Sequence, residues 1–208
     1  MPTQARTVTM PPLDVRADVS AVHDETRTVD VTFATAKADV LRYDWMTGKR
    51  YFERLSLDPK HVRMGRLESG MAPVLDSHSA YSIAHVMGVV KQAALEGKRA
   101  IASLRFSTRA EVEPYYQDIK AKIIQAVSVG YRVFRFEDLA ETREGLPIRL
   151  AIDWEPYEIS MVPMGADVGA RTRSSREVDT NECEIIRATN LVAADADRLR
   201  LFRYVQTR

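Results

Sequence analysis

One segment of this 208-residue chain alternates in the way that is typical of a β-strand, at residues 126–133 (AVSVGYRV). Its three valines and its tyrosine fall on one face, whereas Ser128, Gly130 and Arg132 fall on the other. A glycine beside a serine on the less apolar face leaves room for another backbone to approach. The segment therefore predicts a strand that presents the hydroxyl of Ser128 as a candidate nucleophile.

Strands are also predicted for most of the remaining chain. Alternation predicts half-buried antiparallel strands, with hairpin turns at residues 46–49 and 96–98. One helix is expected with Pro114 in its first turn, because Tyr115, Ile119, Ile123 and either Ala126 or Val127 recur at intervals of about four and define a core-facing stripe. The segments expected to form strands, apart from residues 126–133, are residues 15–21, 29–33, 40–43, 50–57, 83–90, 100–106, 147–152 and 157–162, with a further short strand at residues 183–187. A shorter helix is expected between Asp58 and Gly70.

The patterns divide the chain into four parts. Residues 1–13 predict a flexible N-terminal arm, and residues 14–170 predict one domain. Residues 171–182 are charged and polar and predict a linker, and residues 183–208 predict a tail with a short helix. The composite is an α+β, β-rich fold, in which a partly open antiparallel β-barrel carries flanking helices.

Composition limits the partners and the compartment. The 30 basic and 29 acidic side chains give a net charge of +1, so we expect no nucleic-acid partner. The single cysteine excludes an internal disulfide framework and fits a reducing compartment. No long apolar segment or signal peptide is present, so we expect no membrane partner and a location in the cytosol or inside something assembled there.

Two further segments carry reactive side chains. Residues 74–79 (VLDSHS) form a short apolar run that ends at His78, and residues 154–163 (WEPYEISMVP) supply carboxylates. A hydroxyl, an imidazole and a carboxylate are the groups that acyl transfer needs. Each of these groups could also be purely structural, since a lone histidine or a serine in a strand usually forms only local hydrogen bonds.

The residues of these segments and their order along the chain resemble those of a known family. The VLDSH segment, a helix, the SVGY segment and the EISMVP segment, read in this order, resemble the prohead proteases of tailed phages, a family related to the herpesvirus assembly proteases. The likeness covers residues 40–170. Residues 42–45 and 55–59 resemble members in which the protease heads a capsid-protein polyprotein. The resemblance implies a serine endopeptidase with the barrel fold of the herpesvirus proteases.

The resemblance also implies roles for three residues. Ser128 would be the nucleophile, His78 the general base and Glu158 the acid that orients His78. The herpesvirus relatives use a second histidine in the third role, and this chain has no histidine after His85.

Other assignments stay open at this stage. Asp76, Asp153 and Glu155 compete with Glu158 for the third role, because alternation alone does not exclude them. His61, His78 and His85 are separated by 17 and 7 residues, which is not a ligand spacing known for metal sites, so we expect no metal and no cofactor. Cys183 is expected to be an inert thiol.

The predicted function is that of a serine endopeptidase of phage capsid maturation. By resemblance its substrates and partners would be the scaffold and the major capsid protein, cut inside the assembling prohead in the host cytoplasm, with the protease acting as a homo-oligomer. The chain would be a truncated or self-released part of a longer polyprotein. Two alternatives are a catalytically silent β-barrel that serves as scaffold or internal capsid protein, and an unrelated ligand-binding barrel whose motif match is accidental.

Overall fold

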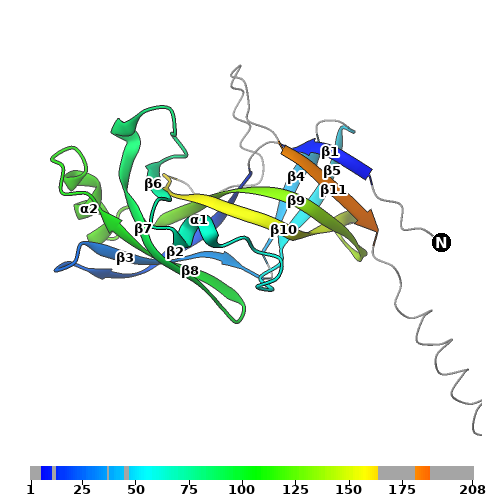
Figure 1. Ribbon diagram of the computed structural model, residues 1–208, viewed down its shortest axis with the longest axis horizontal. Coiled ribbons are helices and arrows are strands. Elements are labelled where there is room, and N and C mark those ends of the chain that lie inside the picture. Colours follow the sequence, from blue (N-terminus) through cyan, green and yellow to red (C-terminus); the bar gives the residue numbers. More distant parts are fainter. Residues whose placement is uncertain (1–5, 11–12, 37, 45–46, 164–180, 188–208) are drawn as a thin grey trace, which may run out of the picture.

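The computed structural model describes residues 6–10, 13–36, 38–44, 47–163 and 181–187 (Figure 1). Strands dominate this part of the chain. The strands are β1 (Arg6–Met10), β2 (Leu13–His23), β3 (Thr28–Thr35), β4 (Asp39–Asp44), β5 (Lys49–Leu55), β6 (Pro73–Asp76), β7 (Val86–Glu96), β8 (Arg99–Phe106), β9 (Ala126–Arg143), β10 (Leu146–Met161) and β11 (Asn181–Arg187). The helices are α1 (Gly65–Glu68), α2 (Glu113–Lys120) and a 3-10 turn, η1 (Ile83–His85).

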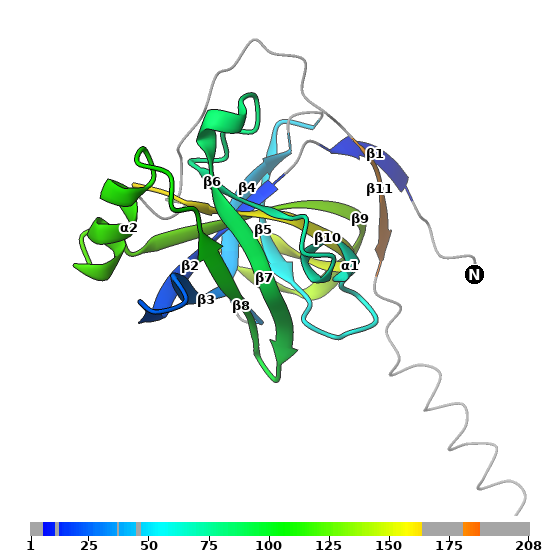
Figure 2. The ribbon, with the colours of Figure 1, turned by 60° about the vertical axis from the view of Figure 1, so that its left-hand side comes forward.

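Seven strands form a barrel in the order β9-β2-β3-β8-β7-β6-β10, because β9 and β10 also pair with each other (Figure 2). Neighbouring strands in it are antiparallel except β6 and β10, which are parallel. The barrel is only partly closed at β6, which contributes four residues. The predicted class, a β-rich α+β fold with a partly open antiparallel barrel and flanking helices, is confirmed.

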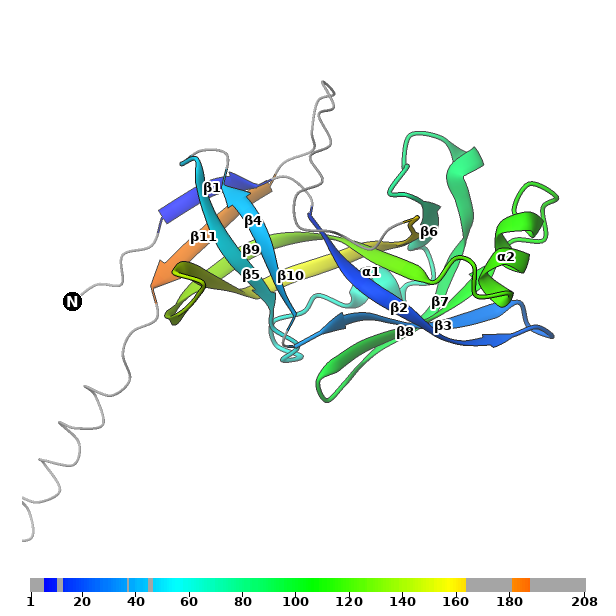
Figure 3. The ribbon, with the colours of Figure 1, turned by 180° about the vertical axis from the view of Figure 1, so that it is seen from behind.

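The hairpin of β9 and β10 is longer than the barrel and connects it to a second group of strands. Its far half pairs with β5 on one side, through residues 148–151 of β10, and with β11 on the other, through residues 135–138 of β9. β4 and β1 complete the two outer edges. As a result α2 and β6 lie at one end of the molecule, and β1, β4, β5 and β11 lie at the other (Figures 1 and 3).

One apolar core fills the barrel. The face of β9 that alternation assigned to the core is fully buried, and its partners across the ladder are Trp154, Pro156, Ile159 and Met161 of β10. Trp154 is also fully buried, and its ring meets that of Tyr131 edge-on at 5.5 Å between centroids. Each large apolar side chain buried in this way contributes about 1.5–3 kcal/mol to folding. The β9 residues of this face are Val127, Val129, Tyr131 and Val133.

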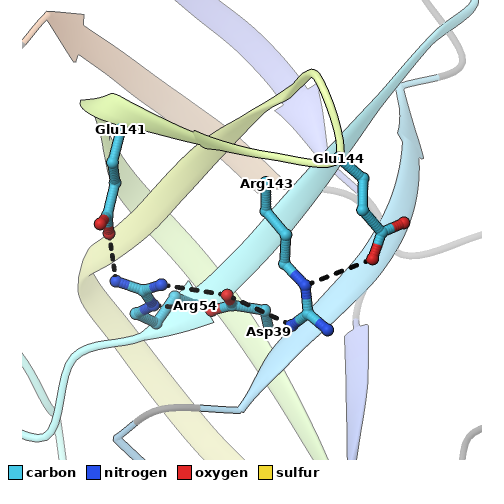
Figure 4. A network of polar contacts seen from close by, with 5 residues as sticks. All are labelled: Asp39, Arg54, Glu141, Arg143 and Glu144. Carbon is cyan, nitrogen blue, oxygen red and sulfur yellow. Dashed lines mark hydrogen bonds and ion pairs between the residues drawn. The ribbon is translucent and has the colours of Figure 1, made fainter.

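The second group of strands is tied to the far end of the hairpin by charged side chains (Figure 4). Arg54 of β5 donates to both oxygens of Asp39 in β4, at 2.6 and 3.0 Å, and to Glu141 at 2.5 Å. Arg143 also donates to Asp39, at 3.4 Å, and contacts Glu144 at 3.5 Å. The hydrogen bonds from Arg54 hold the pKa of the Asp39 carboxyl below its usual value.

The helix α2 differs from the predicted stripe. It spans only Glu113–Lys120 and buries Tyr116 and Ile119. Tyr115 and Ile123, which the spacing assigned to the core, are 43% and 71% exposed. Ile119 is buried as predicted, and Val127 is buried in β9, so the prediction is wrong for Tyr115 and Ile123. The helix ends before Ile123 because the chain reverses at Lys122, whose φ is 59°, and then enters β9.

The structure also differs from the expected boundaries at the two ends of the domain. Residues 6–10 of the expected arm form β1, and residues 183–187 of the expected tail lie in β11. β11 belongs to the sheet because Cys183 and Ile185 are buried in the common core. The helix expected in the tail lies outside the described residues.

The bounds of two further elements differ from those that the sequence patterns predicted. Residues 147–152 and 157–162, expected as two strands, belong to the single strand β10, which extends to Met161. The helix expected between Asp58 and Gly70 is limited to α1. Residues ahead of α1 instead pair with β10, since Trp154 donates its backbone N–H to His61 and accepts one from Arg63.

Candidate active site

β9 places Ser128 between two core valines, on the face opposite the core. The residue directly across the ladder is Ser160 of β10, and Gly130 lies across from Glu158. Side chains that are paired in this way point to the same face and stand about 5 Å apart at Cβ. Ser128 is only 1% exposed, and its hydroxyl has no hydrogen-bond partner within the described part of the chain.

An irregularity in β10 brings Glu158 to that face. The ladder shifts register between Pro156 and Glu158, so Tyr157 is an extra residue on the β10 side. A bulge of this kind reverses which residues face the core. Trp154 points into the core before the bulge, whereas Ile159 and Met161 do so after it. Glu158 is therefore directed away from the core, although it lies an even number of residues after Trp154.

His78 reaches the same face from a strained turn at the end of β6. Both Ser77 and His78 have positive φ, 49° and 60°, and Ser79 donates its backbone N–H to Asp76 at 2.9 Å, as in a type I′ turn. Such turns usually contain glycine or asparagine, and strain of this kind persists where surrounding contacts enforce it. The backbone N–H of Ser77 is held by Met161 at 3.0 Å.

Three hydrogen bonds join these elements. His78 Nδ1 lies 2.6 Å from Glu158 Oε1, and Ser160 Oγ donates to Glu158 Oε2 at 2.6 Å. The backbone N–H of His78 donates to Ser160 Oγ at 3.1 Å. The carboxylate side chain is 3% exposed, whereas the imidazole is 32% exposed. The site thus combines a buried acid with an imidazole that is partly exposed, although its Nε2 atom is buried.

Gly130 supplies the space that Glu158 occupies. A Cβ atom at position 130 would lie 2.1 Å from Glu158 Oε1 and 2.9 Å from its Cδ. Glu158 can therefore occupy this position against the backbone of β9 only because residue 130 has no Cβ, and not because of the conformation of the glycine.

Comparison with known proteins identifies the family of the chain. Residues 73–183, just over half of the chain, match the family described as caudovirus prohead serine protease. The chain belongs to this family. The matched region contains Ser128, His78 and Glu158. Because the family match does not depend on the short motifs alone, it removes the alternative in which their likeness is accidental.

One curated relative of the chain is a capsid protein. The major capsid protein of Halomonas phage phiHAP-1 is 35% identical over 123 residues, which are 57% of this chain and 20% of that protein. The chain thus spans about a fifth of the length of this relative. No solved structure matches the chain at a significant level.

The other candidate carboxylates of this prohead protease domain have different partners. Asp153 accepts two hydrogen bonds from Arg63, at 2.6 and 2.7 Å. Asp76 accepts one from Ser77 Oγ, and its nearest described imidazole nitrogen is that of His85 at 4.0 Å. Glu155 faces Arg132 across the ladder. Among the four carboxylates considered from sequence, Glu158 is the one that binds His78.

A small apolar cavity adjoins the turn that carries His78. It has a volume of about 200 Å³ and borders Asp76 and Ser77 on one side. Its remaining lining is mostly apolar and comes from Met87, Tyr115, Ile124, Met161, Val162 and Pro163. The cavity lies where the ends of β6 and β10 meet the segment around α2.

Two features are absent from the described residues. Among them no three His, Cys, Asp or Glu side chains are grouped as a metal site would require, and His61, one of the histidines considered, binds Ser56 Oγ at 2.8 Å. None of the helices described is long and apolar enough to cross a bilayer.

The sequence patterns did not identify the parts played by Ser160 and Gly130. Ser160 lies two residues after Glu158, so alternation predicts only that the two side chains share a strand face. Its position opposite Ser128 depends on the register of two strands separated by a bulge, and no sequence signal in β9 or β10 fixes that register.

Proposed function

We propose that this chain is a serine endopeptidase of capsid maturation, in which Ser128 is the nucleophile, His78 the general base and Glu158 the orienting acid. The observation that carries the proposal is the hydrogen bond between His78 Nδ1 and Glu158, on the face of β9 and β10 that also carries Ser128. Family membership supports the reaction class.

The carboxylate selects the tautomer of the base. An ionised carboxylate only accepts hydrogen bonds, so the proton of neutral His78 is on Nδ1 and the lone pair is on Nε2. Nε2 then takes the proton of Ser128 Oγ as this oxygen attacks the scissile carbonyl carbon. Burial of Glu158 strengthens its interaction with the imidazolium that forms, since little water competes for the charge.

Two steps complete the reaction. The tetrahedral intermediate collapses, the C–N bond breaks, and the imidazolium gives its proton to the leaving amine, which leaves an acyl-Ser128. Water then attacks the acyl carbon with His78 again as base, and the released Ser128 takes the proton back. Serine is a poor nucleophile at neutral pH, so each step depends on the imidazole.

Capsid proteins are the proposed substrates. The relative in Halomonas phage phiHAP-1 is named a major capsid protein, and the matched region covers only 20% of it, which supports a link between protease and capsid protein. The substrates would be the scaffold and major capsid protein segments, cut inside the prohead by an assembled homo-oligomer, with self-cleavage from a longer polyprotein as a further product.

Burial of Ser128 favours one alternative. A nucleophile that is 1% exposed is not open to a substrate in this conformation, as expected of a catalytically silent barrel that serves as a scaffold or internal capsid protein. Proteolysis therefore requires Ser128 to become accessible when substrate or a second copy binds.

A paired expression experiment separates the two. The chain is expressed with its phage capsid precursor as wild type, Ser128→Ala and the control Ser69→Ala, whose hydroxyl is exposed and binds only neighbouring backbone near α1. Intact-mass analysis should find processed precursor with the wild type and with Ser69→Ala, but not with Ser128→Ala. A fluorophosphonate probe should label the same two proteins. Cutting by Ser128→Ala would refute the nucleophile, and uncut precursor in all three would support the silent barrel.

A further inference from the structure

We propose that Ser160 is a positioning residue of this site: its hydroxyl fixes the carboxylate of Glu158 and the backbone of His78 in one arrangement, and so sets the tautomer of the imidazole. The role rests on the proposed function, because it matters for catalysis only if His78 is the base. Its structural part is measurable without any substrate.

The position of Ser160 is unusual for a strand serine. It is fully buried on the face opposite the core, directly across from Ser128. A buried hydroxyl has one proton to donate and two lone pairs, and burial is costly unless they are used. Ser160 uses both functions, because it donates to Glu158 Oε2 and accepts from the backbone N–H of His78.

The donated hydrogen bond limits how Glu158 can rotate. A carboxylate that is held by only one oxygen turns about its last bond, whereas here Oε2 is bound by Ser160 and Oε1 by His78. The third neighbour is the backbone at Gly130, which Oε1 approaches so closely that no Cβ fits. The carboxylate is therefore held on three sides.

The accepted hydrogen bond acts on the strained turn. The turn at Ser77 and His78 has positive φ at both residues, and one of its backbone donors is bound by Ser160. Strain of this type persists only where neighbours hold it. One hydroxyl thus couples the direction of the carboxylate to the position of the imidazole.

The test measures the tautomer of His78 by ¹⁵N chemical shifts in the neutral range, in the full chain without substrate. We expect a single Nδ1–H tautomer in the wild type. In Ser160→Ala the carboxylate loses one of its two hydrogen bonds, and the Nε2–H tautomer should become visible. In the matched control Ser128→Ala, which removes a buried hydroxyl from the opposite strand, the tautomer should stay as in the wild type.

Kinetics gives a second readout. A hydrogen bond to a charged group is strong enough that its loss should lower kcat about 10- to 100-fold. KM should change less than twofold, since Ser160 lies within the site and is not placed to touch substrate. Ser160→Thr retains a hydroxyl and should restore kcat to within a few fold.

The outcomes separate this role from the proposed function. An unchanged tautomer in folded Ser160→Ala, or a Ser160→Thr variant no better than the alanine variant, would overturn the positioning role whether or not the chain is a protease. Loss of activity in Ser128→Ala tests the protease alone. If Ser160→Ala does not fold, Ser160→Cys replaces it, because a thiol of similar size is a weak donor, and the same change of tautomer is required.

Discussion

At the scale of single residues, the site depends on the absence of a side chain at position 130 as well as on the reactive side chains. Gly130 has no side chain, and the carboxylate of Glu158 fills the space. A methyl group there would meet the far end of a flexible side chain, which can move, and not the backbone. The change should therefore affect the geometry of the site more than the stability of the barrel.

Gly130→Ala tests this distinction. Glu158 should swing away from His78, and kcat should fall by about 10²- to 10⁴-fold, as when a catalytic histidine loses its correct tautomer. Gly88→Ala is the contrasting variant, because its Cβ would lie 2.2 Å from the backbone oxygen of Arg105, which has no room to shift. Gly65→Ala, with no atom within 4 Å of the new Cβ, is the neutral control.

The measurements are the rate of capsid-precursor cleavage and the melting temperature. Gly88→Ala should lose more thermal stability than Gly130→Ala, and Gly65→Ala should match the wild type in both. Full activity in Gly130→Ala would contradict the proposed role of Glu158.

At the scale of elements, the hairpin of β4 and β5 depends on a charge pair. Asp39 is bound by both Arg54 and Arg143, and these bonds lower its pKa (Figure 4). A carboxyl with a lowered pKa in the folded state stabilises the fold above its unfolded pKa of about 3.9. This contribution is lost as the pH falls through the lower pKa of the folded state.

Asp39→Asn should accordingly destabilise the chain by about 1–3 kcal/mol at pH 7. The gap in unfolding free energy between wild type and variant should shrink as the pH falls below about 4. Urea titrations between neutral and acid pH measure it. Glu144→Gln, at a side chain that is 70% exposed, should change little. A gap that stays constant down to acid pH would show that the charge of Asp39 is not what stabilises the hairpin.

The strand β11 makes a separate prediction through its cysteine. Cys183 is fully buried, and burial raises the pKa of its thiol to about 12. Since the thiolate is the reactive form, alkylation of the native protein at pH 8 should be slower than that of the unfolded chain by roughly a thousandfold. Mass spectrometry follows the labelling without ambiguity because the chain has one cysteine. Equal rates in the native and unfolded protein would show that β11 is not docked as described.

At the scale of the whole molecule, β9 and β10 belong to both the barrel and the second group of strands. Neither group has a complete core without this hairpin, because Trp154 and Phe136 both lie in the common core. The two ends of the molecule should therefore unfold together.

Two probes at the two ends test this cooperativity. In a Trp45→Phe background, fluorescence reports on Trp154 in the core, and thiol accessibility reports on Cys183 in β11. Urea should give one transition with the same midpoint for both probes. Accessibility of Cys183 at lower urea than the change in fluorescence would mean that β11 and β1 separate first, as an independent unit.

Much of the local structure could be predicted from the sequence. Alternation gave the core face of β9, and the turn residues gave the hairpins β4–β5 and β7–β8, with Gly97 at positive φ between the latter two. These features depend on contacts between near neighbours. The predicted stripe on α2 was wrong at Tyr115 because Tyr115 and Tyr116 are adjacent and both aromatic. The spacing alone did not show which of the two faces the barrel.

The sequence by itself determined the reactive residue types and the strand-rich class. The residues of three motifs also indicated the family. Only the tertiary structure decided which carboxylate meets His78, because a bulge at Tyr157 reverses the direction of Glu158 and a turn at positive φ aims the imidazole. It also decided that β11 joins the sheet and that Ser160 binds both partners. These outcomes depend on pairing between residues distant in the chain, and that pairing is selected by the packing of the whole core.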